Sequence, residues 1–372
     1  MTPLAVLITN LKLTARSGTE IYVRDLALEL RRRGHSVAVY APIAGGGIAD
    51  ELCSASIPVV SRLDDVGFRP DVIHGHHTHQ TLAALLHFAD APAVFLCHDA
   101  RAWHDEPPRH PRVRRYVAVD HTCREWRLGE SDVPAARVRV ILNFVDLRRF
   151  APRGRLPGRP ARALVFSHLA RPGNFYDAIA EACLRQRIAL DTAGASAGRT
   201  AERPEALLAE YDLVFAKGKA AMEALAVGAA VILVDEMGLG RLVTSSDFAA
   251  QRRANFGRRL LERPVTAKLL SAEIARYDAK DAMRVSRRMR DCGGLVEAVD
   301  SLVALYQEVV SEHAGEGAPD PEAERAAVAA CMARIAATET LIDAENYRRQ
   351  NETLQQEHTV LRQRIARLTS LP

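Results

Sequence analysis

The sequence is poor in several features that would mark a specialised class of protein. Its six cysteines are scattered along 372 residues without a C-x-x-C pair, which argues against a disulfide framework or a cysteine zinc site and indicates reduced thiols in a cytoplasmic protein. The net charge of +4 is too small to indicate a nucleic-acid partner. The longest uncharged apolar run, residues 224–234, is too short to cross a bilayer. The N-terminus lacks a basic region and a cleavage site, so we expect a first strand there and not a signal peptide.

What the sequence does contain is a regular alternation of short apolar runs and amphipathic segments. This pattern predicts an α/β fold, and the chain is longer than one ordinary core requires. We predict a Rossmann-like domain over residues 1–150, a linker rich in Pro, Gly and Arg over 151–160, and a second Rossmann-like domain over 161–294. An amphipathic helix should follow over 295–311. Two such domains facing one another would form a cleft, the usual place for a ligand.

Residues 212–236 carry the clearest candidate for a binding site. An apolar strand leads to Lys217, Gly218 and Lys219, then to a helix that contains Glu223, and then to a strand that is apolar on both faces. In such a unit the helix N-terminus can bind phosphate, and Gly218 lets the ligand approach the backbone. Glu223 could accept hydrogen bonds from ribose hydroxyls. An ordinary crossover with two solvated lysines explains the same pattern.

Glycine loops near other strand ends are further candidates for donor binding. Gly18 and Thr19 open a helix, where they could hold a phosphate or let a sugar approach. The alternative is a plain helix start with Ser17 or Thr19 as its cap. After the strand that ends near Glu236, a flexible loop is predicted around Gly238, Leu239 and Gly240.

Histidines at strand ends are the candidates for contacts with the reacting sugar and the acceptor. Residue His98 follows an apolar strand, where it could contact substrate hydroxyls or share a proton, with Asp99 orienting it; a buried structural histidine is the alternative. Four more histidines, at positions 74, 76, 77 and 79, lack a helical H-x-x-x-H pair or a cysteine partner. We therefore predict no metal site and interpret His74 and His76 as pocket-lining residues on the acceptor side.

The last part of the chain has a different character. A basic helix is predicted over residues 248–261, and we favour a solvated face for it over contact with anionic lipid or phosphate. A polar linker over 312–321 leads to a helical tail, residues 322–372. Leucines spaced by seven there, at 354, 361 and 368, follow Asn351, His358 and Ile365 by three. This short heptad run favours an oligomerising coiled coil, and a single helix packed on the body is the alternative.

Five segments together resemble the family-4 retaining glycosyltransferases, which have the two-Rossmann-domain GT-B architecture. They occur in the family's order and fall within residues 1–310: SGTEIYVRDLALELRRRGHSVAVYAP (17–42), PDVIHGHH (70–77), LCHD (96–99), VRVILNFVDLRRF (138–150) and MEALAVGAAVI (222–232). The resemblance implies that Gly18 lies near the donor phosphates or the acceptor, that His98 contacts the transferred sugar, and that Glu223 binds the donor ribose. It also implies that the helix 295–310 crosses back onto the first domain.

The sequence departs from the family's pattern at three places. Its glycine loop, residues 17–20, reads S-G-T-E where G-G-x-E is common. The family's first Glu, eight positions before Glu223, is Phe215 here. The Arg and Lys that bind the diphosphate after the first strand of the second domain are not evident, although Arg171 is a candidate for one. Lys217 and Lys219 could replace them and would then make a metal unnecessary.

The resemblance implies transfer of a sugar from a nucleotide-diphosphate sugar to an acceptor hydroxyl with retention, in the synthesis of cell-surface glycans or glycoconjugates. No cofactor is expected, and the acceptor is a glycan, a lipid-linked saccharide or a protein. A nucleotide-sugar epimerase of the same fold and a catalytically silent scaffold remain alternatives. We further expect a homo-oligomer in the cytoplasm, with peripheral contact to the inner face of the membrane compatible with its basic segment.

Overall fold

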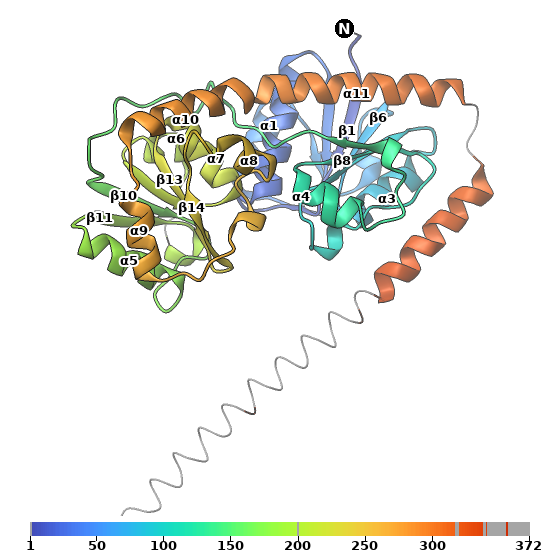
Figure 1. The fold of residues 1–372 in the computed structure, drawn as a ribbon. Coiled ribbons are helices and arrows are strands. Elements are labelled where there is room, and N and C mark those ends of the chain that lie inside the picture. The colour runs from blue at the N-terminus through green and yellow to red at the C-terminus, as the bar shows by residue number, and fades with distance from the viewer. Residues whose placement is uncertain (1, 199–200, 317–319, 338–339, 341–354, 356–372) are drawn as a thin grey trace, which may run out of the picture. The chain divides into compact units, whose positions relative to one another are not determined.

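The computed structural model describes residues 2–198, 201–316, 320–337, 340 and 355. The chain divides into two compact units, one formed by residues 1–107 and 112–317 and the other by 108–111 and 318–372. The first unit contains two α/β lobes, shown in blue to green and in green to orange in Figure 1.

The first lobe is built on a seven-stranded, wholly parallel sheet in the order β5-β3-β1-β6-β7-β8-β9. Its strands β1, β6 and β7 are almost entirely buried, which explains their continuous apolar character. The strands are β1 (Ala5–Thr9), β3 (Ser36–Tyr40), β5 (Val59–Val60), β6 (Val72–His76), β7 (Ala93–Cys97), β8 (Val113–Ala118) and β9 (Val138–Val140). The helices include α1 (Gly18–Arg32), α2 (Gly46–Ser54), α3 (Thr78–His87) and α4 (His121–Cys123), and a small two-stranded sheet pairs β2 (Lys12–Leu13) with β4 (Ile43–Ala44).

The second lobe has a five-stranded sheet in the order β11-β10-β12-β13-β14, parallel except for β14. Its strands are β10 (Arg162–Phe166), β11 (Ala189–Ala193), β12 (Leu213–Ala216), β13 (Ala230–Asp235) and β14 (Gly238–Leu242). Its helices are α5 (Phe175–Arg185), α6 (Pro204–Leu208), α7 (Gly218–Val227), α8 (Phe248–Arg253), α9 (Ala267–Ile274) and α10 (Ala279–Cys292). The α/β fold with parallel sheets predicted from the alternating pattern is confirmed.

The predicted glycine loop after β13 is wrong, because Gly238, Leu239 and Gly240 belong to the edge strand β14. A Cβ atom at Gly238 would lie 2.6 Å from the carbonyl oxygen of Leu261, and one at Gly240 would lie 2.7 Å from the Cβ of Leu233. These glycines therefore allow close packing of a buried strand, and phosphate binding is not needed to explain them.

The last helix of this unit, α11 (Leu295–Gly315), returns to the first lobe, as the resemblance implied. Figure 1 shows it running along that lobe, where α11 contacts α1, β6 and β7. Its buried side chains, among them Val299, Leu302 and Tyr306, join the same hydrophobic core as α1. The chain crosses between the lobes next to Val145, whose N–H donates to Gly293 and whose carbonyl accepts from Leu295.

In the second unit, residues 321–337 are helical. The heptad residues at 351, 354, 358, 361, 365 and 368 lie outside the described residues, so the coiled coil stays a prediction. No helix in the described part of the chain has the length and hydropathy needed to cross a membrane.

Candidate functional site

A cavity of about 410 Å³ is lined by residues from both lobes. It collects several residues that the sequence marked as candidates: Gly18, His98, Asp99, Lys217, Gly218, Lys219 and Glu223. Other candidates do not line it: Thr19, His74, His76, Arg171, Gly238, Leu239 and Gly240. Arg171 lies in an exposed turn before α5. The structure thus brings the turn before α7 opposite the start of α1 and the end of β7.

The turn between β12 and α7 is shaped by glycine. Gly218 has φ +57, a value that side chains other than glycine rarely adopt, and its N–H donates to the carbonyl of Phe256 at 2.8 Å. The first turn of α7 lines the cavity through Gly218, Lys219 and Ala220. Since the first N–H groups of a helix have no partner within the helix, this end of α7 can receive an anion.

The two lysines of this turn are already paired with carboxylates. Lys217 forms an ion pair with the buried Asp235 and is 39% exposed. Lys219 is 14% exposed and bridges the lobes, since its ammonium group lies 3.1 Å from Asp25 and donates to the carbonyl of Phe144 at 2.7 Å. Lys217 is therefore placed to share its charge with a ligand, whereas Lys219 holds the two lobes together.

Glu223 lies in α7 and is only 4% exposed, although it lines the cavity. Burial raises its pKa to about 7, and the nearby Lys219 opposes this shift. Near neutral pH the carboxyl group is thus divided between its protonated and ionised forms. It can both donate to and accept from hydroxyl groups of a ligand.

On the first lobe, the loop before α1 presents Arg16 and Gly18 to the cavity. The carboxylate of the buried Glu20 accepts from the N–H of Ala15 at 2.6 Å and closes this loop. Burial lowers the pKa of Arg16, with Arg24 adding to the effect. No ion-pair partner of Arg16 is found among the described residues, although Glu51 and Glu223 interact with it at longer range, so its guanidinium group can contact a ligand. Ser17 occupies the N-cap position of α1 but makes no side-chain hydrogen bond there.

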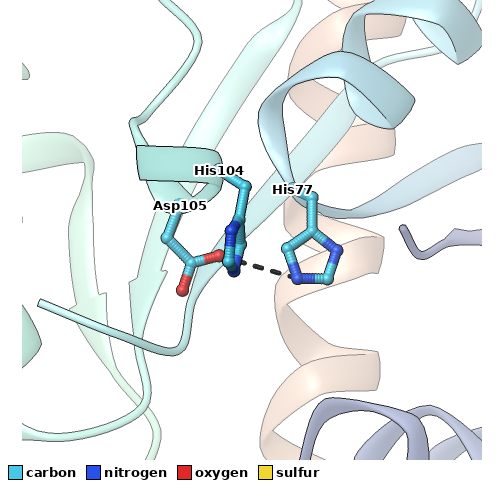
Figure 2. A group of neighbouring side chains, drawn as sticks. All are labelled: His77, His104 and Asp105. Carbon is cyan, nitrogen blue, oxygen red and sulfur yellow. Dashed lines mark ion pairs between the residues drawn. The ribbon is translucent and has the colours of Figure 1, made fainter. Parts of the chain in front are cut away.

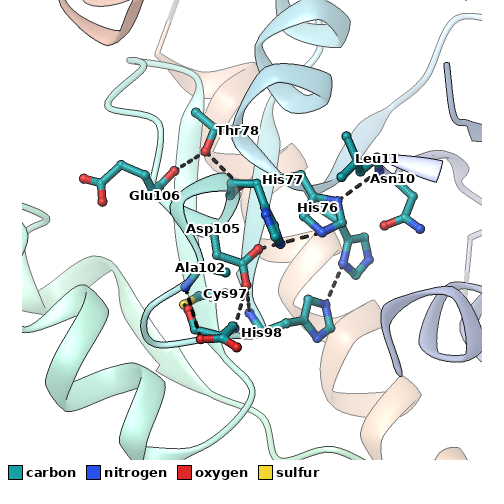
Figure 3. A network of polar contacts seen from close by, with 12 residues as sticks. Asn10, Leu11, His76, His77, Thr78, Cys97, His98, Ala102, Asp105 and Glu106 are labelled. Atoms are coloured by element: carbon teal, nitrogen blue, oxygen red, sulfur yellow. Dashed lines mark hydrogen bonds and ion pairs between the residues drawn. The ribbon is translucent and has the colours of Figure 1, made fainter. Parts of the chain in front are cut away.

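His98, at the end of β7, is held in a neutral form. Its Nε2 lies 2.6 Å from Nδ1 of His76, and the two rings stack with centroids 4.7 Å apart (Figure 3). Burial lowers the pKa of His98 to about 3, and the neighbouring His104 adds to the shift. His98 can therefore offer a neutral hydrogen bond at the cavity wall but no positive charge.

The expectation that Asp99 orients His98 is wrong. One carboxylate oxygen of Asp99 accepts from the N–H groups of Arg101 and Ala102, at 2.7 and 3.1 Å, within its own loop. The ring of His98 is instead oriented by His76. The backbone N–H of His98 donates to the buried carboxyl group of Asp105 at 2.9 Å (Figure 3). The backbone N–H of Asp99 donates to the same carboxyl group at 2.5 Å.

His74 and His76 lie inside the lobe and do not line the cavity. Both are fully buried on β6, and Nδ1 of His74 contacts the hydroxyl of Tyr306 on α11. The structure therefore gives these two residues supporting positions: His76 behind His98, and His74 between the sheet and α11.

Three side chains group closely enough to be tested as metal ligands. Ligand atoms of His77, His104 and Asp105 lie within 4.8 Å of one another (Figure 2). However, Nδ1 of His77 accepts from the N–H of Leu11 at 3.0 Å. The proton of the neutral ring is then on Nε2, the nitrogen that faces Asp105 at 4.0 Å. A metal-bound histidine needs the opposite arrangement, so these residues do not fit a metal site.

The basic segment after β14 is not one helix, and its face is solvated only in part: Arg253, Arg258 and Arg259 are exposed, whereas Arg252 is buried. It breaks at Asn255 and Phe256, which have φ +47 and +53. Its side chains contact the first lobe and the interlobe crossing, since Arg252 donates to the carbonyl of Asn143 at 2.6 Å and Asn255 donates to that of Val119. This segment therefore joins the lobes, and its residues Asn255, Gly257 and Arg258 line the cavity.

Several cavity residues were not singled out from the sequence: Arg16, Trp126, Ser167 and His168. Others lay in segments that the sequence did mark, since Asn143 belongs to a family-like segment and Asn255 and Arg258 to the predicted basic helix. All of them meet only because the lobes pack together. The structure also shows what occupies the position of the missing family Glu. Phe215 lies in β12, is fully buried in the second lobe's core and does not line the cavity.

Comparisons with known proteins agree with this architecture. The family model of Glycosyltransferase Family 4 matches residues 16–149. A glycosyltransferase from Rickettsia africae ESF-5 superposes with a TM-score of 0.61 at 12% identity, covering 83% of this chain and 99% of its own. WaaG, a glycosyltransferase involved in lipopolysaccharide biosynthesis, gives 0.52 at 14% identity, with 81% and 99% covered. A UDP-N-acetylglucosamine 2-epimerase gives 0.51 at 13% identity, with 86% and 99% covered.

Among the curated proteins, none matches the sequence significantly. The family match covers the lobe that contributes Arg16, Gly18 and His98, whereas the structural likeness extends over both lobes. The resemblance to the family-4 glycosyltransferases is thus confirmed for residues 16–149, and the chain has the fold of the GT-B glycosyltransferases.

Proposed function

We propose that this protein transfers a sugar from a nucleotide-diphosphate sugar to an acceptor hydroxyl. The observation that carries the proposal is the cavity itself, in which the N-terminus of α7 and Glu223 face Gly18 and His98. A helix N-terminus and a buried carboxyl group, one turn apart on the same helix, suit the phosphate and the ribose of a nucleotide.

In this proposal the diphosphate binds at the first turn of α7. Lys217 and Arg16 supply positive charge. Its stabilising effect increases as negative charge develops on the leaving diphosphate, so no metal ion is required. Glu223 binds the ribose hydroxyls. His98 holds the transferred sugar through a neutral hydrogen bond, and positioning of donor and acceptor supplies much of the remaining rate. Retention of configuration follows the family resemblance.

The first test is a thermal-shift screen against UDP, GDP, ADP and their common sugars. Binding at a hundredfold excess over the dissociation constant stabilises the folded state by about 2.7 kcal/mol. We expect one base to give a clear shift and Glu223→Gln to reduce it. If no nucleotide shifts the melting temperature, the α7 turn is not a donor site.

The contribution of Lys217 needs a matched control. Lys217→Ala alone leaves the buried Asp235 without its partner, so the double variant Lys217→Ala/Asp235→Asn separates loss of charge from loss of folding. We expect both variants to lose transfer. Full activity in a folded double variant would remove Lys217 from the mechanism.

An epimerase is the second candidate, because a UDP-N-acetylglucosamine 2-epimerase shares the fold over 86% of this chain. It would convert the donor without any acceptor, which nuclear magnetic resonance of the sugar would detect. A catalytically silent scaffold is the third, motivated by the buried Phe215 where the family has a Glu. Binding of a nucleotide sugar without turnover over a broad acceptor panel would favour it.

The wider setting is also proposed. We place the reaction in glycan or glycoconjugate synthesis, in the cytoplasm and near the inner face of the membrane, with the C-terminal heptads forming a homo-oligomer. Deleting residues 322–372 should lower the number of protomers per particle, obtained from the molecular mass in light scattering, while nucleotide binding is retained. An unchanged number of protomers would exclude oligomerisation through the tail.

A further inference from the structure

On the first lobe, the cavity wall contains a tryptophan that is held by an unusual helical turn. Residues Arg124–Leu128 form a π-helical turn, closed by a hydrogen bond from the N–H of Gly129 to the carbonyl of Arg124 at 2.8 Å. A Cβ atom at position 129 would lie 2.6 Å from the carbonyl oxygen of Glu125, so the turn requires glycine. Such turns are rare and frequently occur at functional sites. This one carries Trp126, which lines the cavity half-buried.

Two guanidinium groups face the ring of Trp126. Arg101, from the loop after β7, has its Cζ 5.5 Å from the ring centroid, and Arg259, from the second lobe, has its Cζ at 5.7 Å. Arg259 is neutralised by an ion pair with Glu125. Arg101 has no carboxylate within ion-pair distance in the described residues. Neither does Arg258, whose side chain makes one 3.8 Å contact with Sδ of Met237.

The carboxylates on this wall are bound within their own loops. Asp99 accepts from two N–H groups of its loop, and Asp120 accepts from the N–H of Cys123 at the start of α4. Neither forms an ion pair with Arg101 or Arg258. The cavity wall therefore presents the guanidinium of Arg101, without an ion-pair partner, next to the ring of Trp126, and Arg258 lines the same cavity from the second lobe. This combination suits a sugar that carries an anion.

We propose that the acceptor is anionic, and that its phosphate or carboxylate binds Arg101 and Arg258 while its sugar ring lies against Trp126. This inference rests on the proposed function, in which the donor occupies the α7 turn and leaves this wall to the acceptor. Both arginines line the cavity and are exposed at its rim, so an acceptor can reach them from solvent.

Tryptophan fluorescence can test the proposal because the chain has only two tryptophans, Trp103 and Trp126. The protein is titrated with glucose 6-phosphate, glucuronate and glucose, with and without the nucleotide found in the thermal-shift screen. We expect a saturable change with one or both anionic sugars, absent in Trp126→Phe, and a much weaker response to neutral glucose. Comparing the two anionic sugars shows whether phosphate or carboxylate is preferred.

Arg101→Gln and Arg258→Gln should each weaken binding of the anionic sugar by about tenfold. Arg124→Gln is the matched control, since Arg124 is an exposed arginine of the same turn that does not line the cavity; it should change binding less than about twofold. Equal binding of glucose and the anionic sugars, or equal effects of the three substitutions, would overturn the proposal. A nucleotide shift without anionic binding refutes this inference alone, whereas anionic binding without any nucleotide shift refutes the proposed function alone.

Discussion

At the scale of single residues, the cavity contains groups whose pKa is shifted by burial or by neighbouring side chains. Glu223 is the clearest case, because a carboxyl group with a pKa of about 7 loses its proton only near neutral pH. The folded state then binds more protons than the unfolded state between about pH 4.5 and 7. Stability must therefore fall as pH rises through this interval.

Substituting Glu223 by Gln should remove that loss. A shift from 4.5 to about 7 corresponds to about 3 kcal/mol in the free energy of unfolding. We expect the variant and the parent to differ little at pH 4.5, and the variant to be the more stable by about 2–3 kcal/mol at pH 8. Urea unfolding at both values measures this. A difference independent of pH would show that Glu223 does not titrate as described.

Gly18 offers a second test at this scale. It has no neighbouring atom within 4 Å of a Cβ position and lines the cavity. Gly18→Leu should thus fill space that a ligand needs, weakening nucleotide binding by about tenfold or more while stability changes by less than about 0.5 kcal/mol. Gly67→Leu, at an equally open position outside the cavity, is the control and should leave binding intact. Unchanged nucleotide affinity in Gly18→Leu would place the ligand elsewhere.

At the scale of elements, periodicity and turn chemistry predicted the strands and helices that surround the site. The β12–α7 unit was predictable because a fully apolar strand, a glycine turn and a helix follow one another in sequence. The glycines of β14 misled the prediction, since close packing and ligand approach both require a residue without a side chain. The break at Asn255 and Phe256 could not be foreseen, because their left-handed backbone depends on contacts with the first lobe.

The buried Arg112, which no sequence pattern indicated, stabilises the end of α3. The guanidinium of Arg112 donates to the carbonyls of Leu85, Phe88 and Ala91, at 2.6, 2.7 and 2.9 Å, at the end of α3. Arg112→Met would leave the buried carbonyls of Leu85 and Ala91 without this donor, whereas Phe88 keeps a hydrogen bond from the N–H of Ala91. We expect the free energy of unfolding to fall by about 3 kcal/mol. Urea unfolding measures it, with Arg185→Met on the exposed face of α5 as control at about 0.5 kcal/mol or less. Equal effects would contradict the capping role of Arg112.

At the scale of the whole molecule, the cavity exists because the lobes are held together around it. Lys219 reaches from α7 to Asp25 and Phe144, and Asn255 reaches to Val119. A third connection centres on Glu29, whose fully buried side chain accepts from Arg32, Arg33 and Arg148. Arg33 also binds Asp300 of α11, so Glu29 links α1, the interlobe crossing and the returning helix. Arg32 and Arg33 follow Glu29 within α1 at helical spacing, but the contacts of Lys219, Asn255, Arg148 and Asp300 are not visible in the sequence, because those partners are far apart along the chain.

Glu29 should therefore respond to pH in the opposite direction to Glu223. Burial alone would raise its pKa, but the hydrogen bonds from the three arginines outweigh burial and lower the pKa to about 2. The stabilisation is then fully present above about pH 4.5 and is lost as pH falls towards 2. It amounts to about 3 kcal/mol, from a shift of 4.5 to about 2.

Glu29→Gln should thus lower the free energy of unfolding by about 2–3 kcal/mol at pH 7. The difference should shrink as pH falls below about 4.5, because the carboxyl group of the parent then takes up a proton in the unfolded state. Glu181→Gln, which removes a carboxylate from an exposed ion pair with Arg185, should change stability by about 0.5 kcal/mol or less at every pH. Urea unfolding at pH 7, 5 and 3 gives the three comparisons. A neutral Gln can still accept two hydrogen bonds but cannot attract three guanidinium groups, so the substitution removes charge more than packing. If the loss in free energy of unfolding were as large at pH 3 as at pH 7, packing and not charge would hold this junction between the lobes.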